Sequence, residues 1–253
     1  LDPFFDAWVF APGYSVFEVR GYSAYPVGEE WEVQVTVGQK LRGAVDRHEE
    51  VPLDLTFISA SGEVHDERVV VGGETTVLMA NIPFQPAMVV LNRYARLNQA
   101  RLDHEFRIGP GQPLNALLPH VDFRAYVDHL PDTAFVRVEH IWAAPDQDPL
   151  GQDIIAISDT HYWTVDGLWP EGSVLRGRLL YNGANANELD HGLIAGDETG
   201  ISVVYRPDAT SPWQVYDDQE VTAGSLTNGA GFITLFGLRK GQYAFAKSLS
   251  AVG

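Results

Sequence analysis

Alternation of apolar and polar residues with a period of two is the feature of this sequence that most constrains its fold. In residues 31–37 (WEVQVTV), every odd position is Trp or Val and every even position is Glu, Gln or Thr. This pattern is typical of an antiparallel strand with one face buried. It recurs at residues 53–57 and 135–139, and the short apolar runs at 69–71 and 88–91 predict strands covered on both faces.

Turn-forming dipeptides separate these segments at intervals typical of β-sandwiches. They are Ser61-Gly62, Gly72-Gly73, Asn182-Gly183, Asn228-Gly229 and Lys240-Gly241. Helical periodicity is weak, and the best helical candidate is a short segment at residues 3–9 that the Ala11-Pro12-Gly13 sequence ends. We therefore predict an all-β chain of two β-sandwich domains, preceded by a short N-terminal helical remnant.

The character of the sequence changes near residues 92–100. The β-rich stretch after this point is longer than the one before it and contains more tryptophan. The segment before this change has the size of an immunoglobulin-like or fibronectin-like sandwich. We expect three parts: residues 1–14 as the tail of a preceding domain, 15–98 as the first sandwich, and 99–253 as a second, larger sandwich. The apolar opening run without an initiating Met leads us to expect that the chain is a piece of a longer protein.

Composition excludes several functions. The chain has no cysteine, which rules out disulfide scaffolds and thiolate metal sites, and its net charge of −17 argues against a nucleic-acid partner. No apolar run reaches the roughly 18 residues that span a bilayer. The sequence has few lysines, at Lys40, Lys240 and Lys247. An acidic, lysine-poor surface stays soluble where salt screens self-repulsion, so a salt-adapted (halophile) source is one interpretation and an ordinary acidic extracellular protein is the other.

The histidines do not form a recognisable zinc motif. His48-Glu49-Glu50 is followed by Val51 and Pro52, where the helical His-Glu-x-x-His signature needs its second histidine, and His104-Glu105 is followed by Phe106-Arg107-Ile108. The remaining histidines are scattered, and we expect His140 and His161 to bond backbone or carboxylate groups within a sandwich. No Gly-x-Ser-x-Gly nucleophile motif occurs. A non-local hydrolase site stays a distant alternative.

Acidic pairs offer oxygen ligands for calcium. They are Asp146-Gln147-Asp148, Asp197-Glu198 and Asp217-Asp218. In a chain this acidic such pairs also arise by composition, so calcium is a minor possibility.

The tryptophans of the second half are the other candidate binding residues. Exposed indole rings form a stacking platform for sugars, whereas buried rings are the core of a large sandwich. The residues concerned are Trp142, Trp163, Trp169 and Trp213. The core interpretation is favoured, and carbohydrate or cell-surface binding through these side chains is the alternative function.

The opening residues, in contrast, resemble a specific junction in the gluzincin aminopeptidases, which are aminopeptidase N-like zinc metallopeptidases. In that family an aromatic-Trp-x-x-x-x-Gly-Tyr/Phe-Pro pattern closes the catalytic domain and leads into a small fibronectin-like sandwich. Trp8, Gly13 and Tyr14 match the pattern, whereas Ser15 replaces the proline. The segments 31–39, 51–57 with Ser61-Gly62, and 86–92 resemble strands of that sandwich, so the likeness covers roughly residues 1 to 98.

The second half departs from the family's helical C-terminal domain. Residues 158–167, 204–207 and 237–245 are similar instead to the β-rich tail of some bacterial secreted members. The family's zinc signature and its distal glutamate lie upstream of the matched region. The resemblance therefore assigns no catalytic, cofactor-binding or metal-binding residue to this chain.

The resemblance implies a non-catalytic accessory region of an aminopeptidase-like zinc metallopeptidase, which supports the catalytic domain and shapes substrate access. The partner would be that catalytic domain, in the same polypeptide and carrying zinc, and the location would be periplasmic or extracellular. The expected docking residues are Phe4, Phe5, Trp8, Phe10 and Tyr14. Substrate and oligomeric state are not indicated by the sequence.

Overall fold

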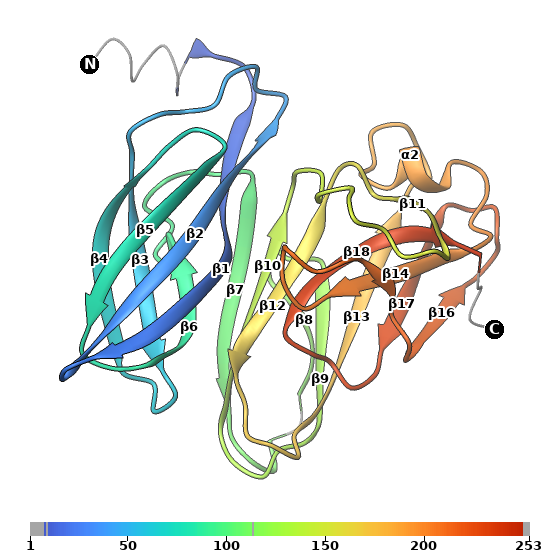
Figure 1. Ribbon diagram of the computed structural model, residues 1–253. Helices are drawn as coiled ribbons and strands as arrows, with labels where there is room; N and C mark the ends of the chain where they lie inside the picture. The colour runs from blue at the N-terminus through green and yellow to red at the C-terminus, as the bar shows by residue number, and fades with distance from the viewer. Residues whose placement is uncertain (1–7, 9, 113, 250–253) are drawn as a thin grey trace. The chain divides into compact units, whose positions relative to one another are not determined.

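The chain is nearly all β, as the alternation predicts, and its strands form antiparallel sheets in sandwich-type arrangements (Figure 1). The computed structural model describes residue 8, residues 10–112 and residues 114–249. The chain divides into two compact units, residues 1–101 (unit 1) and 102–253 (unit 2). The division lies three residues after the expected boundary at 98, because Arg101 belongs to unit 1: its guanidinium donates to the Leu91 carbonyl at 2.8 Å.

Unit 1 consists of two three-stranded sheets, ordered β1-β2-β5 and β4-β3-β6. The strands are β1 (Tyr14–Val27), β2 (Glu30–Arg42), β3 (Val51–Ser59), β4 (Val64–Val71), β5 (Thr75–Ile82) and β6 (Pro86–Leu91). The expected hairpin at residues 60–63 joins β3 to β4, and Gly62 adopts a φ of 88°, which glycine permits at no steric cost.

The core of unit 1 lies between these sheets. In β2 the side chains of Val33, Val35 and Val37 are buried, while Glu32 and Gln34 are exposed, as the period-two pattern requires. Leu55 and Phe57 of β3 are fully buried in the same cluster. The burial of alternate residues from both sheets defines one shared core, which makes the unit a sandwich.

Unit 2 consists of a seven-stranded and a five-stranded sheet. The first is ordered β15-β14-β18-β12-β10-β7, with β11 paired to β18, and the second is ordered β16-β17-β13-β9-β8. The strands are β7 (Arg101–Ile108), β8 (Leu114–Leu118), β9 (Phe123–His129), β10 (Ala134–Ile141), β11 (Ile154–Ile157), β12 (Tyr162–Leu168), β13 (Val174–Asn182), β14 (Ile201–Arg206), β15 (Gln214–Val215), β16 (Gln219–Ala223), β17 (Ala230–Leu235) and β18 (Gly241–Ser248). Their facing side chains form one apolar cluster that includes Trp163 and Phe245.

The structure confirms some of the predictions for individual segments and contradicts others. The run at residues 88–91 is buried on both faces, as predicted, but Val70 of the run at 69–71 is 56% exposed, so β4 presents one face to solvent. The predicted helix at residues 3–9 lies outside the described residues except for Trp8. A four-residue helix, α2 (His191–Ile194), was not predicted. No helix in the described part of the chain has the length and apolar character that a membrane crossing requires.

Candidate functional site

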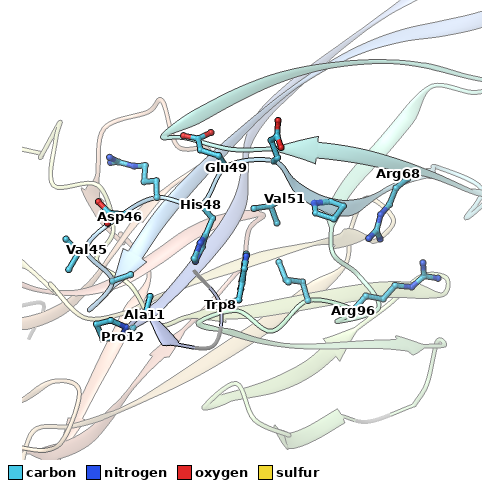
Figure 2. A pocket seen from close by; sticks show the side chains of 16 residues that line it. Trp8, Ala11, Pro12, Val45, Asp46, His48, Glu49, Val51, Arg68 and Arg96 are labelled. Carbon is cyan, nitrogen blue, oxygen red and sulfur yellow. The ribbon is translucent and has the colours of Figure 1, made fainter. Parts of the chain in front are cut away.

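A pocket of about 1260 Å³ lies at the end of unit 1 where β1 begins. Its walls come from residues 11–13, from the loop at residues 44–52 and from Trp8, Arg68, Arg96 and Leu97 (Figure 2). The first segment carries the sequence that resembles the aminopeptidase junction. Of the expected docking residues in the described part of the chain, Trp8 lines this pocket.

Trp8 forms one wall of the pocket by stacking on His48. The ring centroids are 4.0 Å apart and the planes are inclined by 15°. Burial lowers the pKa of His48, which favours the neutral imidazole at physiological pH. The pair is thus an apolar, uncharged stack in an otherwise charged pocket, and such pairs contribute about 1 kcal/mol beyond the area they bury.

The buried amide of Gln39 holds the loop that carries His48. Its Nε2 donates to the carbonyls of His48 (2.9 Å) and Gly73 (2.8 Å), and its Oε1 accepts from the His48 amide at 2.7 Å. Ser15 Oγ donates to the same Oε1 at 3.0 Å. One side chain from β2 therefore ties β1, the pocket loop and the β4–β5 turn together, and it positions the Trp8–His48 stack.

Gly13 brings the opening segment against the pocket loop. Its φ is 86°, and a Cβ built on it would collide with the backbone of Gly43 and Ala44. Tyr14 pairs with Gly43 in an isolated parallel bridge. Gly13, which matches the junction pattern, is required at this position because only glycine allows the two segments to approach so closely.

Charges are distributed unevenly around the pocket. Figure 2 shows Arg68 and Arg96 at one end and Val45 and Asp46 at the other. The two guanidinium groups pair with the carboxylate of Asp54, at 2.6 and 3.0 Å, while their side chains remain 52% and 64% exposed. Two cations therefore share one buried anion at this end of the pocket.

The docking residues predicted from sequence are brought together only in part. Trp8 is half-buried against His48, whereas Phe10 is 74% exposed and Tyr14 is 61% exposed. Phe4 and Phe5 lie outside the described residues. Two large aromatic side chains beside the pocket therefore present apolar area to solvent.

The core interpretation of the unit 2 tryptophans, which the sequence favours over a stacking platform, agrees with the burial of Trp163 and Trp213. Trp163 and Trp213 are fully buried, and their indole N–H groups donate to the carbonyls of Val121 (2.7 Å) and Asp146 (2.8 Å). They cannot present a ring face to a sugar. Trp142 and Trp169 are partly buried, and Lys240 lies over the ring of Trp169 with Nζ 5.4 Å from the centroid. The four rings do not form an exposed platform.

One residue of each acidic pair considered for calcium contacts a protein side chain. Asp146 binds Arg206 at 3.0 Å, Asp217 pairs with Arg239, and Glu198 accepts from the Tyr181 hydroxyl at 2.6 Å. In the described part of the chain, no three His, Asp or Glu side chains converge on a point where a metal ion would be held.

The structure also reveals a polar cluster that sequence reasoning did not assemble. His140 and His161 hydrogen-bond to each other, and His161 reaches the carboxylate of Asp190. The sequence analysis expected His161 to bond a backbone or carboxylate group, and its bond to Asp190 agrees with that expectation. The pairing of the two histidines was missed because residues from separate strands and loops leave no spacing signal.

No known family model, characterised protein or solved structure matches the chain.

Proposed function

We propose that the chain is a non-catalytic accessory region of an aminopeptidase-like zinc metallopeptidase, in which unit 1 packs on the catalytic domain and shapes access of substrates to it. The observation that carries the proposal is the aromatic strip beside the pocket. Trp8 is anchored on His48, and the neighbouring Phe10 and Tyr14 leave most of their surface in solvent. Such exposed apolar area next to a concave surface is typical of an interface.

The architecture around the strip fits a mechanical role. Gln39 and Gly13 fix the pocket loop and the opening segment against each other, so the strip rests on a rigid support. At about 25 cal/mol per Å² of apolar surface, covering two aromatic side chains stabilises an interface by several kcal/mol. The zinc and the catalytic residues would belong to the catalytic domain upstream. We further propose a periplasmic or extracellular location, as in the secreted proteins that the sequence resembles.

Two measurements on the purified chain test this proposal. Hydrolysis of aminoacyl anilides, assayed with and without added zinc, should stay at the background rate. An apolar-surface dye such as ANS should bind, and binding should fall in a Phe10→Ser, Tyr14→Ser double variant but not in a Val70→Ser variant on the outer face of β4. Chelator-sensitive hydrolysis by the pure chain, or dye binding that is indifferent to Phe10 and Tyr14, would contradict the proposal.

A further inference from the structure

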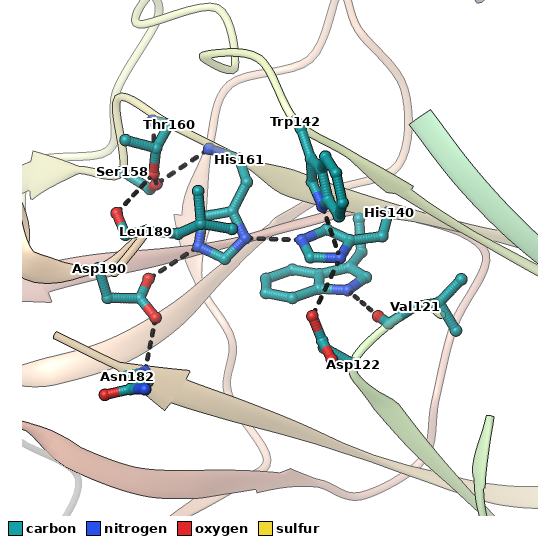
Figure 3. Close-up of polar contacts among 11 residues, drawn as sticks. Val121, Asp122, His140, Trp142, Ser158, Thr160, His161, Asn182, Leu189 and Asp190 are labelled. Atoms are coloured by element: carbon teal, nitrogen blue, oxygen red, sulfur yellow. Dashed lines mark hydrogen bonds and ion pairs between the residues drawn. The ribbon is translucent and has the colours of Figure 1, made fainter. Parts of the chain in front are cut away.

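Unit 2 contains a buried, ordered chain of hydrogen bonds that the proposed accessory role does not use. His140 Nε2 lies 2.7 Å from His161 Nδ1, and His161 Nε2 lies 2.7 Å from Asp190 Oδ1 (Figure 3). These three side chains are at most 4% exposed. Asp190 Oδ2 accepts from the Asn182 amide at 2.8 Å, which holds the carboxylate in place.

The indole of Trp142 fixes the direction of every bond in this chain. An indole N–H can only donate, and Trp142 Nε1 lies 3.1 Å from His140 Nδ1. His140 Nδ1 therefore accepts, which makes its Nε2 the protonated donor to His161 Nδ1. By the same argument His161 Nε2 carries the proton that it donates to Asp190. Both imidazoles are neutral in this arrangement, and only the carboxylate at the inner end is charged.

A second group faces the outer end of the chain. Asp122 Oδ2 lies 3.6 Å from His140 Nδ1, and the Asp122 side chain is 64% exposed. Asp122 adopts a φ of 50° in the turn before β9, and Trp163 holds that turn through the bond from its indole to the Val121 carbonyl. Trp163 also stacks on His140, with ring centroids 4.6 Å apart. The carboxylate is thus held opposite a nitrogen that the neutral state uses as an acceptor.

We propose that this cluster is an acid-responsive latch: neutral His140 holds the Trp142 indole, and uptake of one proton at His140 Nδ1 releases that indole and engages Asp122. The proton comes from solvent, and the imidazole gains one positive charge. Its new N–H group then faces the Trp142 N–H, an arrangement of two donors, and attracts the Asp122 carboxylate. Through the bond from His140 Nε2 to His161 Nδ1, the added charge is shared toward Asp190.

Two carboxylates face the imidazoles from different elements. They are Asp122, from the turn before β9, and Asp190, from the segment before α2. Trp163 of β12 and Phe245 of β18, which also contact the rings, carry no charge. His191 of α2 directs its Nδ1 to the Gly183 carbonyl at 2.9 Å rather than to the cluster.

The indole N–H resonances test the latch by nuclear magnetic resonance between about pH 8 and about pH 5, the interval in which histidine titrates. The Trp142 resonance, assigned with a Trp142→Phe variant, should move with an acid transition and exchange faster with solvent below it. Trp213 is the built-in control because its indole donates to the backbone carbonyl of Asp146, which does not titrate in this interval, whereas Trp163 stacks on His140 and is not used as a control. The Trp213 resonance should stay unchanged.

A charge variant provides the second arm. Asp122→Asn removes the carboxylate that favours protonation and should move the transition by on the order of one pH unit toward acid. Asp153→Asn, at an exposed position of the same unit, should leave it in place. The latch is overturned by a Trp142 resonance that is constant across the interval, by an equal movement of the Trp142 and Trp213 resonances, or by equal shifts in the two variants.

Discussion

Gln39 and His48 are joined in both directions: the Gln39 amide group donates to the His48 carbonyl at 2.9 Å, and its oxygen accepts from the His48 amide at 2.7 Å. A glutamine placed in this way makes the two hydrogen bonds that a neighbouring strand would make, and the Gly73 backbone amide adds a third to the His48 carbonyl at 3.1 Å. The loop at residues 44–50 is therefore ordered by a side chain of β2, and the Trp8 stack depends on that order.

Replacement of Gln39 by alanine tests this dependence. The substitution leaves the His48 amide and the Gly73 carbonyl without the partner they have in the wild type, and we expect a loss of about 2 kcal/mol in the free energy of unfolding. Gln34→Ala, on the exposed face of the same strand, is the matched control and should change stability by less than about 0.5 kcal/mol. Urea unfolding measures both, and equal effects would contradict the role assigned to Gln39.

Gly13→Ala should separate the opening segment from the pocket loop. A Cβ at residue 13 collides with the backbone of Gly43 and Ala44, and the φ of 86° is unfavourable for alanine. We expect a loss of more than about 1 kcal/mol and a change in the near-ultraviolet dichroism of Trp8. Gly21→Ala in β1 has open space around its Cβ and serves as the control. A Gly13→Ala variant as stable as Gly21→Ala would contradict the close approach.

The contributions of two carboxylates of unit 2, Asp166 and Asp128, to folding stability should change with pH in opposite directions. Burial raises the pKa of Asp166 to about 6, against the opposing effects of Lys240 and the Gly167 amide. The hydrogen bonds of Arg176 lower the pKa of Asp128. The native state therefore binds a proton at Asp166 that the unfolded chain has lost, so this contribution to stability is present in acid and disappears as pH rises through about 6. The contribution of Asp128 is present at neutral pH and is lost in acid.

Single amide variants measure these signs. Relative to wild type, Asp166→Asn should gain stability as pH rises from about 4 to about 7. Asp128→Asn should instead lose stability as pH rises from about 2 to about 4, because the lowered pKa of Asp128 places its titration in that interval. Urea unfolding of the three proteins at several pH values gives the differences directly. The same trend in both variants would show that net charge, rather than the local surroundings, determines the response.

The acidic surface leads us to propose salt adaptation, and salt is expected to stabilise the fold. Seventeen net negative charges repel one another, and an increase from about 0.1 M to about 1 M salt shortens the screening length from about 10 Å to about 3 Å. The melting temperature should therefore rise with KCl and should not rise with an uncharged osmolyte to the same degree. No increase on going to molar KCl would contradict the proposal.

The strands could be predicted from the sequence alone, whereas the candidate site could not. Alternation in β2 and the Ser61-Gly62 turn identified local structure because side-chain period and turn chemistry are local properties. The prediction that the strand at residues 69–71 is covered on both faces was wrong at Val70. A short run of β-branched residues has the same sequence pattern whether one face or both faces are covered. For Trp163 and Trp213 the sequence favoured burial in a core, and both are fully buried. The stacking platform stayed an alternative because an indole suits both a core and a binding surface.

The pocket and the latch depend on contacts between distant residues. Trp8 meets His48 across a loop, and His140 meets His161 and Asp190 from separate elements. The two-way role of Gln39 also requires a strand and a loop that only the fold brings together. Gly13 was a local sequence signal of the pocket, because it belongs to the junction pattern and its lack of a side chain is required in the structure.

The central claim, that this chain accompanies a zinc peptidase domain, is tested most directly by sequencing the natural coding region upstream of the codon for Leu1. We expect, in the same reading frame, a segment encoding His-Glu-x-x-His on a helical pattern with a glutamate further along, the ligand set of a zinc peptidase. A stop codon or an unrelated domain directly upstream would contradict it.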